Sequence, residues 1–304
     1  MKGVRVAHHA QGGIHHAHVG LDAGQKDPGA SALAKTIRQA RHRITLSLFR
    51  CNDAEILAEL ARATARGVAV GVLLTSRAKG GKKKRQKLWA ALETIGAVVW
   101  AHTDPVVKYH AKYLVADDGP AVVASLNLTR KCFERTCDAV VLTYDPDVVT
   151  GLRQLMAADR DGLAAPETLS DRLIIGPERA RRQLTALIVQ ARTSIRLIDA
   201  KLSDPDLVIL LRARRAEGLT VEIFGSKQLG ELKSHGKIML IDDALAVVGS
   251  LALASLSLDF RREVAIVVDD APAIADVQQL FGAINALPTE GRAGTAEAPG
   301  EALC

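Results

Sequence analysis

The chain has 304 residues, of which 48% are hydrophobic and 24% charged, a balance that excludes a wholly disordered protein and fits one large or two ordinary domains. Its formal net charge is +6, and aromatic residues make up only 3% of the sequence. A basic protein with few aromatic side chains is expected to bind phosphate groups rather than to stack on nucleobases.

No segment predicts a membrane helix or a secretion signal. The longest apolar stretch, Ala244–Leu258, is shorter than the roughly 20 residues of a spanning helix and is interrupted by Gly249 and by serines. The first 20 residues are rich in histidine and lack the apolar core of a signal peptide. We therefore expect a cytoplasmic protein whose cysteines are reduced thiols. The cysteines are Cys51, Cys132, Cys137 and Cys304.

The sequence repeats itself once. One set of residues recurs 151 positions later and a second set recurs 125 positions later, so the second copy is 26 residues shorter in its middle. A repeat of this length indicates a duplicated half-domain rather than a solenoid. The recurring residues are Gln39, Ala40, Arg41, Ile44, Asp53, Leu60 and Gly67 at the first offset, and His110, Lys112, Asp117, Asp118, Val122, Val123 and Ser125 at the second.

The first copy begins with a predicted strand at Ile44–Phe49. Asp53 then predicts the N-cap of a helix, Gly67 ends that helix, and Val68–Leu74 predicts a buried strand. The extra residues of this copy contain a basic run, a helix ended by Gly96, and a strand at Ala97–Trp100.

The second copy repeats this plan. Ile195–Ile198 predicts a strand, Asp204 with Pro205 begins a helix, and Leu219–Phe224 predicts the next strand. Alternating strands and helices in both copies predict an α/β fold. We expect disordered tails at residues 1–30 and 287–304, a first half at 31–160 and a second half at 166–286, with the joint at Asp159–Thr168.

A hairpin in each copy carries the candidate chemistry. Tyr109–Val115 predicts a strand that places His110 and Lys112 on one face. A turn and a returning strand bring Ser125 and Asn127 back beside them. The second copy predicts the same hairpin, with His235, Lys237 and Ser250.

These residue types suit a phosphate. Lysine supplies fixed charge, short polar groups donate to the phosphate oxygens, and imidazole can attack phosphorus or carry a proton near neutral pH. Asp138 and Glu263 lie eleven residues after Asn127 and Ala252, and a carboxylate there could orient an imidazole. A single His-x-Lys pair is most often a solvated strand edge, but a matched pair at one offset is hard to explain by packing alone.

The motif resembles that of the phospholipase D superfamily. Each copy has His-x-Lys, then four residues and an Asp, then a Ser-x-Asn-like end, and the resemblance covers about residues 31–285. It implies two tandem phospholipase D-like repeats, each a mixed β-sheet flanked by helices, packed with pseudo-twofold symmetry around one active site. It further implies a covalent phosphohistidine intermediate without a metal or other cofactor, and a monomer that can be active because it holds both motifs.

The resemblance assigns roles to the matching residues. It implies that His110 and His235 are nucleophile and general acid, with His110 favoured as nucleophile, and that Lys112 and Lys237 bind the phosphate. It assigns oxygen-binding roles to Ser125, Asn127 and Ser250, and orienting roles to Asp138 and Glu263. The motif aspartates, Asp117 and Asp242, fall at the far turn of each hairpin and are interpreted as structural.

Two positions depart from the family pattern. Ala124 replaces the usual glycine, which is a minor steric change. Ala252 stands where the second copy would carry an asparagine, which removes one phosphate donor and predicts either an asymmetric site or reduced activity.

Three substrate hypotheses remain open. The first is a phospholipid phosphodiesterase or phosphatidyltransferase similar to soluble phospholipase D and cardiolipin synthase proteins, the second is a nuclease that contacts the nucleic-acid backbone, and the third is a degenerate phosphate-binding protein. Two complete His and Lys pairs count against the third, and scarce aromatics weaken the second. We therefore favour phospholipid over nucleic acid.

One segment carries the excess positive charge. Residues 77–87 contain seven lysines and arginines and no acid, and without them the chain has 33 basic and 34 acidic residues. Such a run is usually a solvated loop. We expect it to be the place where the protein could contact an anionic membrane peripherally.

Overall fold

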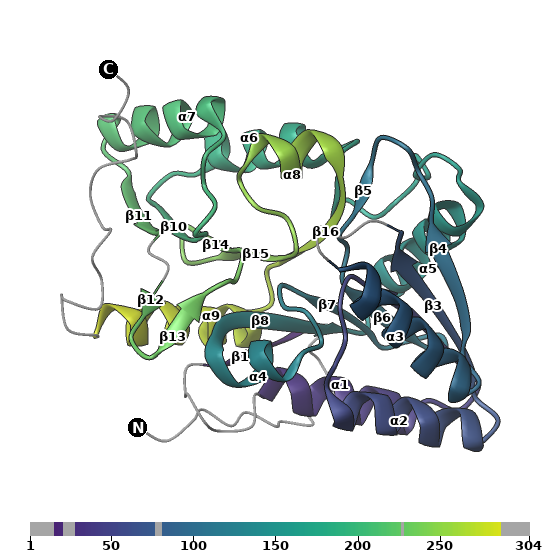
Figure 1. The fold of residues 1–304 in the computed structure, drawn as a ribbon. Coiled ribbons are helices and arrows are strands. Elements are labelled where there is room, and N and C mark those ends of the chain that lie inside the picture. Colours follow the sequence, from purple (N-terminus) through teal and green to yellow (C-terminus); the bar gives the residue numbers. More distant parts are fainter. Residues whose placement is uncertain (1–14, 21–27, 77–80, 226–227, 287–304) are drawn as a thin grey trace.

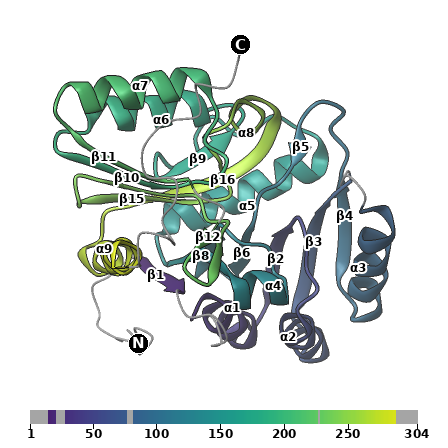
Figure 2. The same ribbon diagram turned by 60° about the vertical axis from the view of Figure 1, so that its left-hand side comes forward.

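The computed structural model describes residues 15–20, 28–76, 81–225 and 228–286. Within these residues two β-sheets face each other across the middle of the molecule, and helices cover their outer faces (Figure 1 and Figure 2). The sheets have nine and seven strands. The predicted α/β fold is confirmed.

The first half of the chain builds most of the nine-stranded sheet, in the order β4-β3-β2-β6-β7-β8, with β1 paired to β8. Its elements are β1 (His15–Gly20), α1 (Pro28–Gln39), β2 (Arg43–Leu48), α2 (Ala54–Ala65), β3 (Ala69–Thr75), α3 (Lys82–Thr94), β4 (Val98–His102), β5 (Lys108–Tyr109), β6 (Tyr113–Ala116), β7 (Ala121–Ala124), α4 (Arg130–Arg135), β8 (Thr136–Thr143) and α5 (Pro146–Asp161).

The second half builds most of the seven-stranded sheet, in the order β11-β10-β14-β15-β16, with β9 paired to β16. Its elements are β9 (Leu173–Gly176), α6 (Ala180–Gln190), β10 (Ser194–Ile198), α7 (Pro205–Ala216), β11 (Thr220–Phe224), β12 (Gln228–Leu229), β13 (Leu232–Ser234), β14 (Ile238–Ile241), β15 (Leu245–Gly249), α8 (Ser255–Phe260), β16 (Arg261–Val268) and α9 (Ala271–Asn285).

The two halves pair their strands in the same way. β2 runs parallel to β3 and antiparallel to β6, and β10 runs parallel to β11 and antiparallel to β14. The following hairpins, β6-β7 and β14-β15, then lead to the last strands β8 and β16. Each half is thus a mixed sheet of the same order, and the first half adds α3 and β4 at its edge.

Alternation along the strands separates three apolar cores. Leu46 and Val72 pack with helices α1 and α2 on the outer face of the first sheet. Leu197 and Met239 pack with α6 and α7 on the outer face of the second sheet. A central core joins the inner faces of both sheets and includes side chains from α5 and α9, such as Leu152. The outer face of each sheet therefore packs against helices of its own half, and the inner face contributes to a core that both halves share.

The predicted helix caps are confirmed. The Asp53 carboxylate accepts the Ile56 backbone N–H at 3.0 Å at the start of α2, and Asp204 does the same for Leu207 at 3.2 Å at the start of α7. Gly67, at φ 85°, follows α2 in a left-handed conformation that glycine adopts without strain. The buried Cys51, Cys132 and Cys137 are free thiols, as expected.

The amino-terminal boundary differs from the prediction. Residues 15–20, expected in a disordered tail, form β1, which pairs antiparallel with β8. β1 lies on β8 as β9 lies on β16, with Gly20 opposite Asp138 and Gly176 opposite Glu263. A strand that pairs with an open sheet edge through its backbone does not need alternating apolar residues, so the sequence pattern does not predict β1. The rest of the predicted tails, 1–14, 21–27 and 287–304, lies outside the described residues.

The basic segment also differs from the prediction of a loop. Residues 82–87 form the start of helix α3, and Lys82, Lys83, Lys84 and Lys87 are exposed on it. Residues 77–80 lie outside the described residues. At the predicted joint, α5 continues to Asp161 and ends at Gly162, at φ 69°. In the part of the chain that the structure describes, no helix is both long enough and apolar enough to cross a membrane.

Candidate active site

Two short strands cross from one half to the other and place the motif histidines. β5 of the first half pairs with β16, and β13 of the second half pairs with β8, both in parallel. The predicted continuous strand at Tyr109–Val115 is therefore wrong: the chain leaves β5 at His110 and joins its own sheet as β6 only at Tyr113. A period of two cannot distinguish one strand from two pieces that belong to different sheets.

The crossing brings His110 to the acid of the opposite half. The His110 backbone N–H donates to the Arg262 carbonyl oxygen at 2.9 Å, so the next residue of β16, Glu263, lies beside the imidazole. Nδ1 of His110 lies 2.8 Å from Oε2 of Glu263. Oε1 of Glu263 accepts a hydrogen bond from Ser257 of α8 at 2.9 Å, and Glu263 is fully buried. The acid is thus fixed from one side and holds the imidazole on the other.

The second histidine repeats this arrangement with the halves exchanged. The Gly236 N–H donates to the Cys137 carbonyl at 2.8 Å, which places His235 beside Asp138. Nδ1 of His235 lies 3.0 and 3.1 Å from the two oxygens of Asp138. Those oxygens also accept hydrogen bonds from Ser125 and from Thr136, each at 2.6 Å. With each Nδ1 on a carboxylate, Nε2 is the nitrogen left for chemistry on both rings.

The motif lysines lie beside the histidines. Lys112 Nζ is 3.1 Å from Nδ1 and 3.4 Å from Nε2 of His110, and it donates to the His110 carbonyl at 2.7 Å. Lys237 Nζ donates to the His235 carbonyl. Both lysines are buried. The hydrogen bonds to the backbone carbonyls hold both ammonium groups in place before an anion binds, so the anion does not have to order mobile side chains.

Burial and the two lysines control the ionisation of His110. Burial, partly opposed by Glu263 and reinforced by Lys112 and Lys237, lowers the pKa of His110 to about 3. Burial likewise lowers the pKa of Lys112 to about 7, against the attraction of Glu263. Burial raises the pKa of Asp138, but His235, Lys237 and the Ser125 hydrogen bond outweigh it and leave that pKa below its usual range. Burial also raises the pKa of Glu263, but His110 and Lys112 outweigh it, so an ionised Glu263 lies beside a neutral His110 imidazole at neutral pH.

The motif serines, Ser125 and Ser250, form hydrogen bonds to buried groups of the protein. Ser125 donates to Asp138 and accepts the Ala139 N–H at 2.9 Å, and Ser250 donates to the Val264 carbonyl at 3.3 Å and accepts the Val264 N–H at 3.1 Å. Both side chains are fully buried. Their geometry fits residues that position the acids and the last strands better than the predicted contact with phosphate oxygens.

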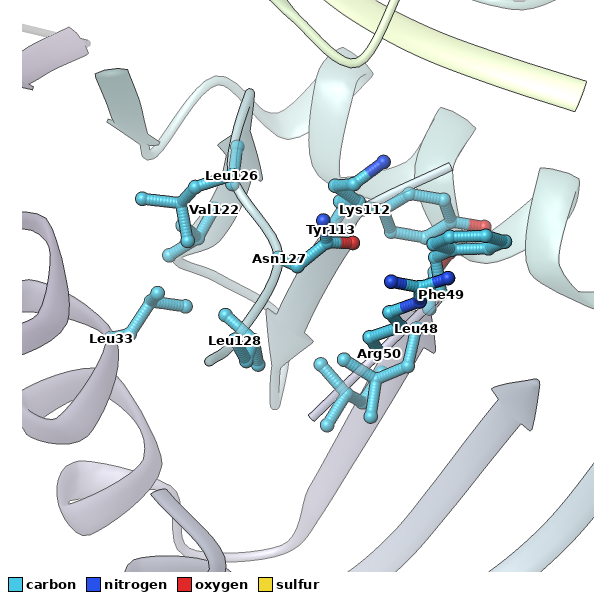
Figure 3. Close-up of a pocket in the computed structure, with 13 residues that line it drawn as sticks. Leu33, Leu48, Phe49, Arg50, Lys112, Tyr113, Val122, Leu126, Asn127 and Leu128 are labelled. Atoms are coloured by element: carbon cyan, nitrogen blue, oxygen red, sulfur yellow. The ribbon is translucent and has the colours of Figure 1, made fainter. Parts of the chain in front are cut away.

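Asn127 lies in a different environment. Together with Lys112, Phe49 and Arg50 it lines a cavity of about 10 Å³, whose opposite wall is apolar (Figure 3). Its Oδ1 is buried and has no hydrogen-bond partner among the described residues. At the equivalent position, the Ala252 backbone N–H donates to Ser257 at 3.0 Å. The two equivalent positions therefore differ in their contacts.

The motif aspartates lie at the far turns. Asp117 accepts hydrogen bonds from the backbone N–H groups of Arg41, His42 and Arg43 at 2.7 to 2.9 Å. Asp242 accepts the backbone N–H groups of Arg192, Thr193 and Ser194 in the same way, at 2.7 to 3.0 Å. Each carboxylate ties the far turn of a hairpin to the loop that precedes the first strand of its half, away from the histidines.

Several residues of the site were not recognised in the sequence. Arg50 and Lys201 follow β2 and β10 and are related by the same offset of 151 as the helix caps, so the repeat could have revealed them. Burial, then Lys237 and Arg261, lowers the pKa of Lys201. Arg261 Nη1 is 4.0 Å from Glu263 Oε1. These cations extend the positive charge of the site beyond the two motif lysines.

Arg262 supports the His110 side of the site. Its guanidinium is buried and donates to Asp159 of α5 at 2.8 Å, to the Gly176 carbonyl at 2.8 Å and to Glu178 at 2.8 Å. Its own carbonyl holds the His110 N–H. Arg262 thus connects the first half, strand β9 and the backbone of a motif histidine. At the equivalent position the second crossing uses Cys137.

Known proteins resemble this chain in sequence over one half and in fold over most of its length. Residues 33–160 match the family described as cardiolipin synthase, phospholipase D-like domain. Among solved structures, a phosphatidylserine synthase from Haemophilus influenzae is 13% identical with a TM-score of 0.64, over 93% of this chain and 89% of that one. No curated protein sequence matches.

A polyphosphate kinase from Porphyromonas gingivalis is 17% identical with a TM-score of 0.67, over 86% of this chain. The chain spans only 45% of that kinase's length. At such identities these structures show a shared fold. The chain thus resembles the phospholipase D superfamily in sequence over residues 33–160 and in fold over most of its length.

Proposed function

We propose that the chain is a phosphodiesterase or phosphatidyltransferase that acts on phospholipid through a covalent phosphohistidine. The observation that carries the proposal is the pair of imidazoles, each held at Nδ1 by a buried acid from the opposite half, next to two buried lysines. Each half supplies one histidine and the acid for the other, so both halves are needed for one site. A single chain supplies both pairs, and we propose that a monomer suffices.

His110 is the proposed nucleophile. It is neutral at physiological pH because its pKa is lowered to about 3, so the Nε2 lone pair is available. In the first step Nε2 forms a bond to phosphorus while the bond from phosphorus to the leaving alcohol oxygen breaks. Glu263 stabilises the charge that develops on the ring, and the lysines stabilise the phosphoryl oxygens.

His235 is the proposed general acid. Its side chain is 26% exposed, against 11% for His110, so it can exchange protons with solvent. It gives its Nε2 proton to the leaving oxygen in the first step. In the second step it takes a proton from water or from an acceptor alcohol, whose oxygen attacks phosphorus as the bond to His110 breaks.

Two short helices at the site favour an amphipathic substrate. α8, which contacts Glu263 through Ser257, exposes Leu256 and Phe260, four residues apart on one face, with exposed fractions of 62% and 51%. α4 exposes Lys131 and Arg135 at the equivalent positions. An apolar rim on one side and a cationic rim on the other suit the acyl chains and anionic headgroup of a phospholipid better than a nucleic-acid backbone.

The exposed lysines of α3 provide the proposed peripheral contact. Lys82, Lys83, Lys84 and Lys87 belong to the basic segment of residues 77–87, and each Lys near an anionic surface contributes about 1 kcal/mol to binding. Neutralising them is expected to weaken binding to anionic vesicles more than it changes the chemical step.

A substrate panel tests the proposal. Turnover is measured in parallel on phosphatidylcholine vesicles, phosphatidylglycerol vesicles, single-stranded DNA and an aryl phosphodiester, for the parent and for the double variant Leu256→Ser with Phe260→Ser. We expect lipid turnover in the parent, a several-fold loss of it in the double variant, and unchanged turnover of the aryl phosphodiester, because α8 contributes only to the rim.

The matched control is Ile209→Ser on α7, which removes a side chain that is 64% exposed and lies outside the site. Cleavage of DNA without any lipid turnover would replace the lipid assignment by a nuclease. Absence of turnover on all four substrates, with phosphate still bound, would indicate a degenerate member and would contradict the proposal.

A further inference from the structure

A thiol lies against one of the two histidine–acid pairs. Sγ of Cys132, a nitrogen of His235 and a carboxylate oxygen of Asp138 all lie within 4.8 Å of one another. Cys132 is on α4, and the residue at the equivalent position of α8 is Ser257, whose hydroxyl donates to Glu263. Where Ser257 donates a hydrogen bond to Glu263, the equivalent position beside Asp138 thus carries a thiol, which can bind a metal.

We propose that Cys132, Asp138 and His235 form an inhibitory zinc site that competes with catalysis. Thiolate, carboxylate and imidazole are the three ligand types that Zn²⁺ prefers, and three protein ligands leave a fourth position for water. Among the described residues, Cys132, Asp138 and His235 are the one group of three such side chains whose ligand atoms all lie within 4.8 Å of one another. Glu263 and His110 lack a thiol, because Ser257 replaces it.

The Asp138 carboxylate could bind a metal without changing its conformation. Ser125 and Thr136 each donate to one oxygen of Asp138, and the remaining lone pairs face His235 Nδ1 at 3.0 and 3.1 Å. A zinc ion about 2.0 Å from nitrogen and oxygen fits between atoms at that separation. The two hydroxyl donors would continue to orient the carboxylate, as such donors do around bound metals.

Charge and access permit the ion. Zinc with a thiolate, a carboxylate and a neutral imidazole has no net charge. The neighbouring Lys237 therefore meets no additional repulsion. The ion can enter from the His235 side, where the side chain is 26% exposed, whereas Cys132 and Asp138 are buried behind it.

Zinc at this position would stop the proposed proton transfer. The ion replaces the proton on Nδ1, and binding also releases the thiol proton. Nε2 then carries the N–H of a neutral, metal-bound ring, which is a much weaker acid than imidazolium. His235 could no longer protonate the leaving alcohol, and a chelator would restore activity.

The experiment combines a binding signal with inhibition. Cobalt(II), which takes zinc sites, is added to the parent and to Cys132→Ser, and the near-ultraviolet thiolate-to-cobalt absorption is recorded. Zinc chloride is then titrated against turnover of an aryl phosphodiester. We expect the thiolate absorption in the parent alone, and a concentration for half-inhibition that is on the order of 10-fold higher or more in Cys132→Ser.

Two further variants complete the test. Cys51→Ala removes a buried thiol outside the cluster and should keep the cobalt absorption and the zinc sensitivity of the parent. Ser257→Cys supplies the missing thiol beside Glu263 and should add zinc sensitivity to Cys132→Ser. No thiolate absorption in the parent, or equal zinc sensitivity in parent and Cys132→Ser, would overturn the zinc site. The amino-terminal histidines cannot produce the absorption, and the cobalt measurement does not depend on the proposed enzymatic function.

Discussion

The His110–Glu263 and His235–Asp138 pairs have the same connection but different surroundings. The ring centroids of His110 and Phe49 are 4.5 Å apart, and His110 also contacts Lys112. His235 is more exposed and lies near the Cys132 thiol. Glu263 receives one serine hydroxyl at Oε1, and Asp138 receives a hydroxyl at each oxygen. A duplicated motif can therefore support two different steps, because burial and neighbouring charge set the ionisation of each imidazole.

The largest expected effect comes from removing either histidine. His235→Ala should lose at least about 10³-fold in turnover and accumulate a phosphohistidine on His110, since the base that activates water for hydrolysis of the adduct is missing. His110→Ala should lose as much and form no adduct. Mass spectrometry after rapid quenching locates the adduct. An adduct on His235 would reverse the assignment, and parental activity in both variants would remove the two-histidine mechanism.

Removing the acids should act across the halves. Asp138→Asn is expected to slow turnover about 10²-fold to 10⁴-fold through His235, and Glu263→Gln to slow adduct formation similarly through His110. Single-turnover kinetics separate the two steps, and circular dichroism checks that both variants fold. With an aryl phosphodiester, whose leaving group needs little protonation, equal effects of both substitutions on adduct formation would contradict the separate roles of the two pairs.

The two crossings should differ in stability. Arg262→Met removes four side-chain hydrogen bonds, to Asp159, Gly176 and Glu178, and leaves Asp159 buried without its partner, so we expect a loss of about 3 to 5 kcal/mol in the free energy of unfolding. Cys137→Ala at the equivalent position removes only a small buried side chain and should cost about 1 to 2 kcal/mol. Urea unfolding measures both, and a larger loss in Cys137→Ala would contradict the importance of the Arg262 network.

The smallest effect is on pH dependence. Because the pKa of Lys112 is about 7, its charge is lost as pH rises above 7, and KM for an anionic substrate should rise by up to about tenfold per pH unit. Because the pKa of His110 is about 3, the nucleophile should remain neutral as pH falls from 7 to 4. Lys112→Arg keeps its charge and should remove the alkaline rise in KM, provided that its melting temperature matches the parent. An unchanged alkaline profile in that variant would assign the effect to another group.

The duplicated strand–helix plan and the four motif side chains could be predicted because they leave local signals. Asp53 and Asp204 cap helices by bonds to residues three positions away, and Lys112 lies two residues from His110. The strand crossings could not be predicted, because β5 has only two residues and its partner is 153 positions away. The burial of Ser125 likewise depends on packing between the sheets, which residue spacing does not describe.

The crossed strands also constrain how the molecule can fold and be divided. β5 needs β16, β13 needs β8, and the central core takes side chains from both halves, so neither half can complete its share of the active site alone. Contacts between residues so far apart form late and slowly. The active site is therefore expected to be among the last parts to assemble, and fragments cut at the joint should regain activity only when both are refolded together.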